Sequence, residues 1–134
     1  MRNRTFDPSP FLNALDGDRT TFLEFGQQFL AMLPDSLAAL AEAAAAGDAE
    51  ALRDRAHSLK GSLALFHAER LVHELETVEQ ACRMAPATIG SAVLHSLQAE
   101  SRAFRDEFDE FCARMSGEAL ARSHMFNREE GARQ

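Results

Sequence analysis

The stretch 49-AEALRDRAHSLKGSLALF-66 decides the fold, because its apolar residues recur at alternating spacings of three and four. This period places them on one face of an α-helix and predicts a helix that buries that face in a core. Asp48 precedes the stretch as an N-cap residue, and His67 follows it at the position where the helix is expected to end. The predicted core seam consists of Ala49, Leu52, Ala56, Leu59, Leu63 and Phe66.

The direction of this seam fixes the direction of the other side chains on the helix. At about 100° per residue, His57 points about 140° away from the middle of the seam, toward solvent or a groove. Gly61 lies one turn further on, where a glycine costs about 1 kcal/mol relative to alanine. Because helical side chains lean toward the N-terminus, a larger residue at position 61 would cover His57. The alternative to an accessible functional imidazole is an ordinary surface histidine.

Positive charge is expected beside this imidazole. Lys60 and Arg53 lie at i+3 and i−4 from His57, within helical reach of an anion on the ring. The small side chain of Ala64 leaves the surface of the next turn uncovered. An exposed nucleophilic nitrogen with a neighbouring cation suits phosphoryl transfer. The chain has no GxxxxGK[ST] loop, no GxGxxG turn and no kinase motif set. We therefore expect a phosphoryl carrier rather than an enzyme, without an ATP site of its own.

The rest of the chain predicts an all-α fold, an up-down four-helix bundle with a short N-terminal helical arm. Asp18 or Thr20 is expected to cap the helix before Gly47, and Pro34 to kink or break it. Pro86 closes the helix that follows the quoted stretch. The further helices are expected at 18–47, 68–84 and 88–116, and the arm at 11–15.

The predicted domain covers residues 1–117, and 118–134 form a tail that either adds a helical turn or frays. The core is expected to contain Phe104, Phe108 and Phe111. A bundle of this kind completes its core within one chain, so a monomer is expected.

A net charge of −7 has the wrong sign for a protein that binds nucleic acid or an anionic membrane. No apolar stretch has the length of a signal peptide or a membrane span. Cys82 and Cys112 are expected to be reduced thiols, which fits a cytoplasmic protein.

Neither a metal nor a cofactor is expected. The histidines other than His57 lack the spacing of zinc ligands. The acidic residues of the helix at 68–84 are expected on a solvated face, and Glu79 alone has a second possible role, orienting the ring of His57 through its other nitrogen. The four histidines other than His57 are His67, His73, His95 and His124. The acidic residues of this helix other than Glu79 are Glu69, Glu74 and Glu76.

The segment 56-AHSLKGS-62, followed by Leu71 and Leu75-Glu76, resembles the signature of the histidine-containing phosphotransfer (HPt) domain family. The resemblance covers roughly residues 10 to 84, and the last helix matches in pattern only. Its upstream part consists of residues 15–18, Phe29, Leu40, 47–48 and Leu52.

The resemblance implies that His57 accepts a phosphoryl group from the aspartate of a response-regulator receiver domain and returns it to such a domain. The Mg²⁺ ion would be held by the receiver, and a sensor or hybrid histidine kinase would act upstream. Lys60 would stabilise the phosphate and Gly61 would give access. The surrounding binding surface would comprise Arg53, Ser62, Ala64, Glu79 and Arg83.

One position departs from the family pattern, since His67 stands where the family usually has glycine. Histidine tolerates a left-handed backbone better than most residues, so the helix is still expected to stop there. One alternative to phosphotransfer remains, a helical adaptor that would bind a receiver or kinase domain without accepting phosphate. A third class, a helical hydrolase or metalloenzyme, lacks its ligands.

Overall fold

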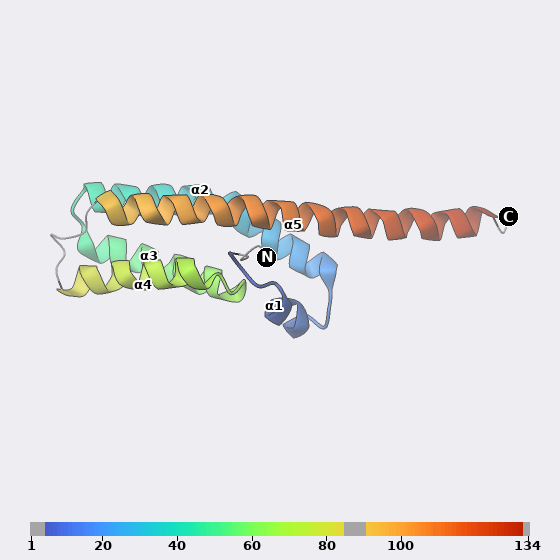
Figure 1. Cartoon of the computed structure of the whole chain (residues 1–134), viewed down its shortest axis with the longest axis horizontal. Helices are drawn as coiled ribbons and strands as arrows, with labels where there is room; N and C mark the ends of the chain where they lie inside the picture. The colour runs from blue at the N-terminus through green and yellow to red at the C-terminus, as the bar shows by residue number, and fades with distance from the viewer. Residues whose placement is uncertain (1–4, 85–90, 133–134) are drawn as a thin grey trace.

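The computed structural model describes residues 5–84 and 91–132, with side chains described for 5–84 and 93–117. In Figure 1, α2 and α5 form one layer of a bundle, α3 and α4 form the other, and α1 lies at one end. Each long helix contacts its two neighbours around the bundle. The predicted all-α four-helix bundle with an N-terminal helical arm is therefore confirmed. The helices are α1 (Ser9–Ala14), α2 (Arg19–Ala45), α3 (Ala49–Leu65), α4 (Glu69–Met84) and α5 (Ser91–Ala132).

Helix α2 begins at a side-chain cap and passes through a proline. Asp18 accepts hydrogen bonds from the backbone N–H of Thr21 at 3.2 Å and from its hydroxyl at 2.7 Å, so Asp18 rather than Thr20 is the cap. These bonds lower the pKa of the Asp18 carboxyl. Pro34 lies inside the continuous helix, so of the two expected effects, a kink or a break, no break occurs; Figure 1 shows a change of direction along α2. Packing along α2 outweighs the single lost backbone hydrogen bond.

Helix α3 ends in a Schellman motif, as the sequence predicted for a left-handed stop at position 67. His67 has a φ of 51°, and its N–H donates to the carbonyl of Ala64 at 3.1 Å. The N–H of Ala68 donates to the carbonyl of Leu63 at 3.3 Å. These two bonds satisfy carbonyls that a helix end otherwise leaves free. A histidine therefore ends this helix in the backbone conformation that glycine usually supplies.

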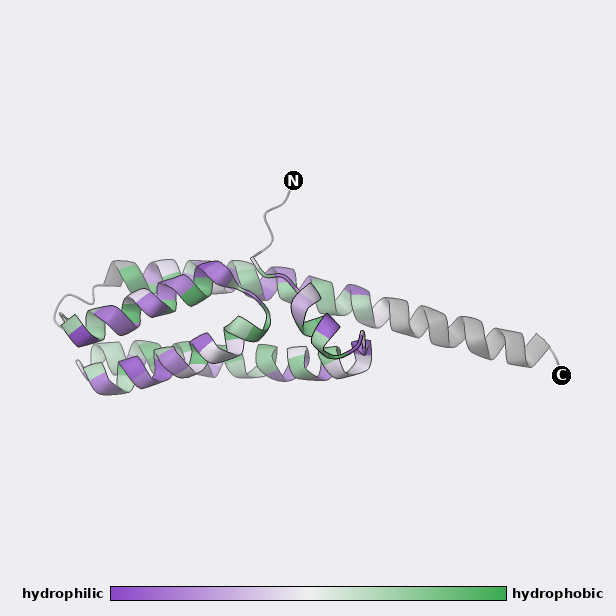
Figure 2. Ribbon diagram, turned by 90° about the horizontal axis from the view of Figure 1, so that it is seen from below, coloured by the Kyte–Doolittle hydropathy of each residue, from purple (hydrophilic) through white to green (hydrophobic). Residues whose placement is uncertain are grey.

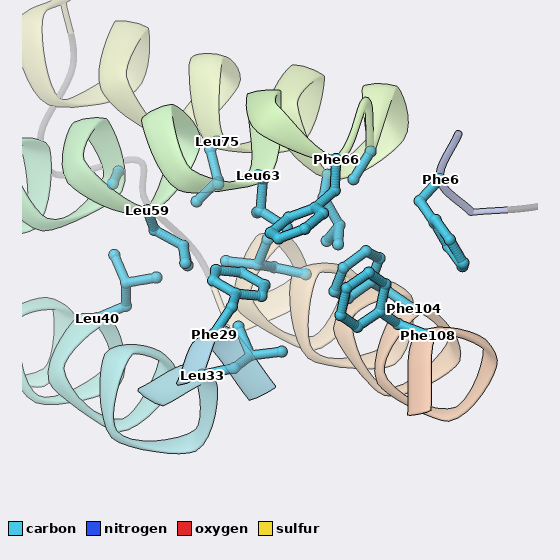
Figure 3. Close-up of a cluster of buried hydrophobic side chains, with 14 of the residues drawn as sticks. Phe6, Phe29, Leu33, Leu40, Leu59, Leu63, Phe66, Leu75, Phe104 and Phe108 are labelled. Atoms are coloured by element: carbon cyan, nitrogen blue, oxygen red, sulfur yellow. The ribbon is translucent and has the colours of Figure 1, made fainter. Parts of the chain in front are cut away.

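The predicted seam of α3 is buried, apart from the partly exposed Ala49 at its beginning. Figure 3 shows Leu59, Leu63 and Phe66 pointing toward side chains of α2 and α5. The ring of Phe66 lies 4.8 Å from that of Phe108 between centroids, in an edge-to-face arrangement that aromatic pairs favour. In Figure 2, hydrophilic and hydrophobic segments alternate along the helices, which fits helices that bury one face.

The residues before α1 pack into the core. Phe6 is 4% exposed, and its ring lies 5.1–5.7 Å from three rings of α5. Thr5 donates its N–H and its hydroxyl to Glu107 at 2.8 and 3.0 Å. The N–H of Asp7 donates to the carbonyl of Phe66 at 3.0 Å. The arm thus joins the end of α3 to α5.

Helix α5 continues beyond its predicted end. The predicted end was Ser116, but the helix runs without interruption through Gly117 to Ala132, and Figure 1 shows it extending past the bundle. An interior glycine costs only about 1 kcal/mol, which does not suffice to end a helix. The predicted start at Thr88 lies outside the described residues, and the division between domain and tail at 117 stays a prediction. Among the described residues, no helix is long and apolar enough to cross a membrane.

Candidate functional site

The side chain of His57 stands on the outer surface of α3. It is 72% exposed, whereas its seam neighbours Ala56 and Leu59 are buried. This is the outward direction that the position of the seam predicts. The ring is therefore open to a partner on the side that faces solvent.

Helix α4 places a buried carboxylate against this ring. The Glu79 side chain is only 8% exposed, and its Oε2 lies 3.4 Å from His57 Nδ1. Its other oxygen, Oε1, lies 3.0 Å from Lys60 Nζ. Burial raises the pKa of Glu79, but the hydrogen bonds and charges of Lys60 and His57 outweigh it, so that the pKa lies below its ordinary value. Glu79 is thus an ionised carboxylate shared by the histidine and the lysine.

The ammonium of Lys60 belongs to this cluster. It was expected near the imidazole, where an anion on the ring would sit. It pairs with the same carboxylate that contacts His57, and its side chain is 23% exposed. The carboxylate therefore links the two groups that the sequence analysis treated as direct neighbours.

Gly61 is exposed and has no packing partner. A Cβ added to it would meet no atom within 4 Å. No neighbouring side chain or backbone needs the space, so the packing of the bundle does not account for this glycine. Its effect is to leave a low surface one turn beyond His57.

Two other predicted residues do not join the contacts that link His57, Glu79 and Lys60. The ion pair of Arg53 is with its neighbour Asp54, at 3.9 Å, and not with the groups around His57. Ser62 is half-buried and lies about 160° around the helix from Lys60. Helical reach alone does not determine which partner a long side chain selects, since a neighbouring carboxylate can compete for it.

Two shallow hollows run along the surface between α3 and α4, beside the cluster. One has a volume of about 360 Å³, and the other, largely apolar, has a volume of about 250 Å³. They share His73 and Glu76, so they form one continuous groove, which we call the α3–α4 groove. The first hollow is lined by Lys60, His73, Glu76, Thr77, Glu79, Gln80 and Arg83, and the second by Ala64, His67, Glu69, Val72, His73 and Glu76.

Within the part of the chain that the structure describes, no three histidine, cysteine or acidic side chains are grouped so that they could hold a metal ion. Cys82 and Cys112 are free and buried. Burial raises the pKa of the Cys112 thiol to about 11, which favours the unreactive protonated form.

Comparison with known proteins gives two matches. The family model described as Hpt domain matches residues 24–117. Among solved structures, the chain is similar to the crystal structure of histidine-containing phosphotransfer protein B from Pseudomonas aeruginosa PAO1, with a TM-score of 0.75 and 24% sequence identity. The match covers 84% of this chain and 98% of that chain, and it shows a shared fold. No curated protein matches the sequence significantly.

Proposed function

Because the chain belongs to the Hpt domain family, we propose that His57 is its phosphoacceptor: it takes a phosphoryl group from the aspartate of one receiver domain and passes it to another. The observation that carries this proposal is the contact between His57 Nδ1 and the buried carboxylate of Glu79, on a ring that is otherwise exposed. A carboxylate at Nδ1 favours the tautomer that carries its proton there. Nε2 then has a free lone pair on the accessible side of the ring.

The reaction balances without a separate base. The lone pair of His57 Nε2 attacks the phosphorus of the receiver's aspartyl phosphate, the P–O bond to the aspartate breaks, and its electrons remain on the aspartate carboxylate. The proton on Nδ1 stays in place. The positive charge that the ring gains lies against Glu79, whose ionised carboxylate offsets it. Transfer to the next receiver is the reverse of this step.

Lys60 and Gly61 assist in different ways. The Lys60 ammonium lies at the edge of the cluster and stabilises the anionic phosphoryl oxygens on the ring. Gly61 lets the receiver approach, because a side chain at this position would project over His57. Both roles concern the outer surface of α3 and add nothing to the core.

The partners follow from the reaction. We propose receiver domains as donor and acceptor, a sensor or hybrid histidine kinase upstream, and Mg²⁺ held by the receiver. The protein would act in the cytoplasm as a monomeric carrier without an ATP site. A helical adaptor that binds a receiver without accepting phosphate is the alternative function.

Incubation with a phosphorylated receiver domain and Mg²⁺ separates these two functions. Phosphotransfer predicts label on this chain that is labile to acid and stable to base, and none on the His57→Gln variant. Binding of the receiver without any label would support the adaptor. Label that persists in His57→Gln would show that another residue is the acceptor.

A further inference from the structure

Residues 5–8, the part of the N-terminal arm that precedes α1, cross one end of the bundle, and we call them the N-terminal strap. Thr5 donates its N–H and its hydroxyl to the same oxygen of Glu107 on α5, at 2.8 and 3.0 Å. The N–H of Asp7 donates to the carbonyl of Phe66 at the end of α3, at 3.0 Å. The strap is therefore bonded to two different helices over a very short stretch of chain.

These two helices are not neighbours around the bundle. The neighbours of α3 are α2 and α4, and the neighbours of α5 are the same two helices. Helices α3 and α5 therefore lie diagonally opposite each other, in different layers of Figure 1. The rings of Phe66 and Phe108 meet across this diagonal, with their centroids 4.8 Å apart. The strap adds hydrogen bonds to this contact and closes the end of the bundle.

Between its two bonded residues, the strap carries a buried aromatic ring. Phe6 lies edge-to-face against Phe104, Phe108 and Phe111 of α5, at centroid distances of 5.1–5.7 Å. Figure 3 shows its ring beside those of Phe104 and Phe108. Pro8 is also buried. These two side chains and the hydrogen bonds of Thr5 and Asp7 hold the strap in place.

The contacts of the strap are few compared with those that hold the bundle. Each of the four long helices buries a row of side chains along its length. Helix α1 follows the strap, and none of its residues is buried. Segments with few buried contacts open locally while core helices remain folded, because the free energy of opening differs across a structure. The strap can therefore open separately from the bundle.

We propose that the N-terminal strap is a conformational device that opens and closes while the four-helix bundle stays folded, and that its closure keeps the end of α3 ordered. The closed strap supplies a donor to the Phe66 carbonyl, one of the groups that a helix end otherwise leaves unpaired. Opening removes this donor and the connection to α5. His57 lies nine residues before Phe66, about 14 Å along the helix axis, so the proposal does not depend on phosphotransfer.

The contact between Thr5 and Glu107 is the point at which charge would control the strap. Both hydrogen bonds of Thr5 end on one carboxylate oxygen. A negative charge at position 5 would remove the hydroxyl donor and would face Glu107 as a like charge. Because Thr5 is only partly buried, such a change leaves the core side chains in place. Thr5→Glu therefore opens the strap without altering Phe6.

Native-state hydrogen exchange of the full chain, followed by NMR at single amides, tests the proposal. The N–H groups of His67 and Ala68 donate to carbonyls of the last turn of α3 and report on its order. For Thr5→Glu we expect these two amides to exchange about tenfold faster than in wild type, while amides in the middle of α3 change by about twofold at most. Thr20→Glu is the matched control, because it makes the same substitution at an exposed residue of α2.

A second substitution tests whether Glu107 is the group that responds. Glu107→Gln in the Thr5→Glu background should reverse most of the faster exchange, because it removes the like charge and keeps an acceptor. Unchanged exchange at His67 and Ala68 in Thr5→Glu would overturn the proposal. Equal acceleration in all four long helices would also overturn it, because the strap would then open only when the bundle unfolds. An effect that Glu107→Gln does not reduce, or that Thr20→Glu reproduces, would exclude control through Thr5 and Glu107.

Discussion

Gly26 and Gly61 are both interior glycines of long helices, yet their surroundings are opposite. A Cβ on Gly26 would lie 3.0 Å from Phe108 Cζ and 3.2 Å from Cys112 Sγ, both on α5. A Cβ on Gly61 would meet nothing within 4 Å. The first glycine allows α2 and α5 to approach each other, whereas the second allows nothing inside the molecule to approach.

The comparison distinguishes a glycine that helix packing requires from a glycine that helix packing does not require. Both positions carry the same penalty of about 1 kcal/mol for glycine in a helix. At Gly26 the close packing of α2 on α5 offsets this penalty. At Gly61 no internal contact offsets it. This observation supports the proposed role of Gly61 in giving a partner access to His57.

The packing role of Gly26 is tested by Gly26→Leu. The leucine side chain would collide with Phe108 and Cys112, and we expect a loss of about 3 kcal/mol in the free energy of unfolding. Urea unfolding followed by circular dichroism measures this loss. Gly61→Leu is the matched control and should not destabilise the protein; a similar loss in both variants would remove the distinction between the two glycines.

The access role of Gly61 is tested by Gly61→Gln. We expect transfer from a phosphorylated receiver to become about thirtyfold slower, equivalent to about 2 kcal/mol in the activation free energy, because the new side chain covers His57. Single-turnover transfer measures this rate. Gly117→Gln is the control, because Gly117 is another helix-interior glycine with open space around it and lies on α5. Unchanged transfer in Gly61→Gln would contradict the access role.

The polar cluster beside Gly61 is tested by Lys60→Ala. The substitution leaves the buried Glu79 without its cation, so we expect a loss of about 1.5 kcal/mol in stability, together with slower transfer and a shorter-lived phosphohistidine. From the sequence alone, an exposed Lys60 would have had little effect on stability. Thermal unfolding and the decay of labelled protein measure the two effects. An unchanged melting temperature would show that the ion pair adds no stability.

The loss of stability in Lys60→Ala should depend on pH. Because the pKa of Glu79 is lowered in the folded protein, its interactions contribute stability above its unfolded value of 4.5. That contribution is lost as the pH falls through the lower folded value. The difference in stability between wild type and Lys60→Ala should therefore be full at pH 7 and should shrink on acidification below about pH 4.5. A difference that is constant from pH 7 to pH 3 would exclude Glu79 as its source.

The smallest expected effect is that of Gly61→Ala. Alanine should raise the free energy of unfolding by about 0.7 kcal/mol, because the site is open and alanine favours a helix. Its methyl group covers little of His57, so transfer should slow far less than in Gly61→Gln. Urea unfolding checks the gain. A destabilised Gly61→Ala would reveal a packing requirement at this position after all.

Local features of this chain could be predicted from the sequence. The seam of α3, the cap at Asp48 and the stop at His67 each depend on residues within a few positions of one another. Helical periodicity also gave the outward direction of His57. The family signature lies in the same helix, so fold and candidate site were predicted from one segment.

Contacts between distant segments could not be predicted in this way. The burial of Phe6, the fit of Gly26 against α5 and the pairing of Lys60 with Glu79 each depend on how helices lie in space. Arg53 was predicted from spacing alone, and Asp54 competes for it. The predicted end of α5 at Ser116 was also wrong. The helix continues through Gly117, because helix formation is cooperative and the neighbouring turns are helical.

The N-terminal arm has a consequence for how the chain folds. The bond from Thr5 to Glu107 spans 102 positions, whereas α3 and α4, which carry His57 and Glu79, are consecutive. Contacts close in sequence form with a small loss of loop entropy, and distant ones follow later. During synthesis on the ribosome, all residues of the α3–α4 hairpin, which carries the proposed phosphotransfer site, are made before Glu107. We therefore expect the arm to dock last, after this hairpin has formed.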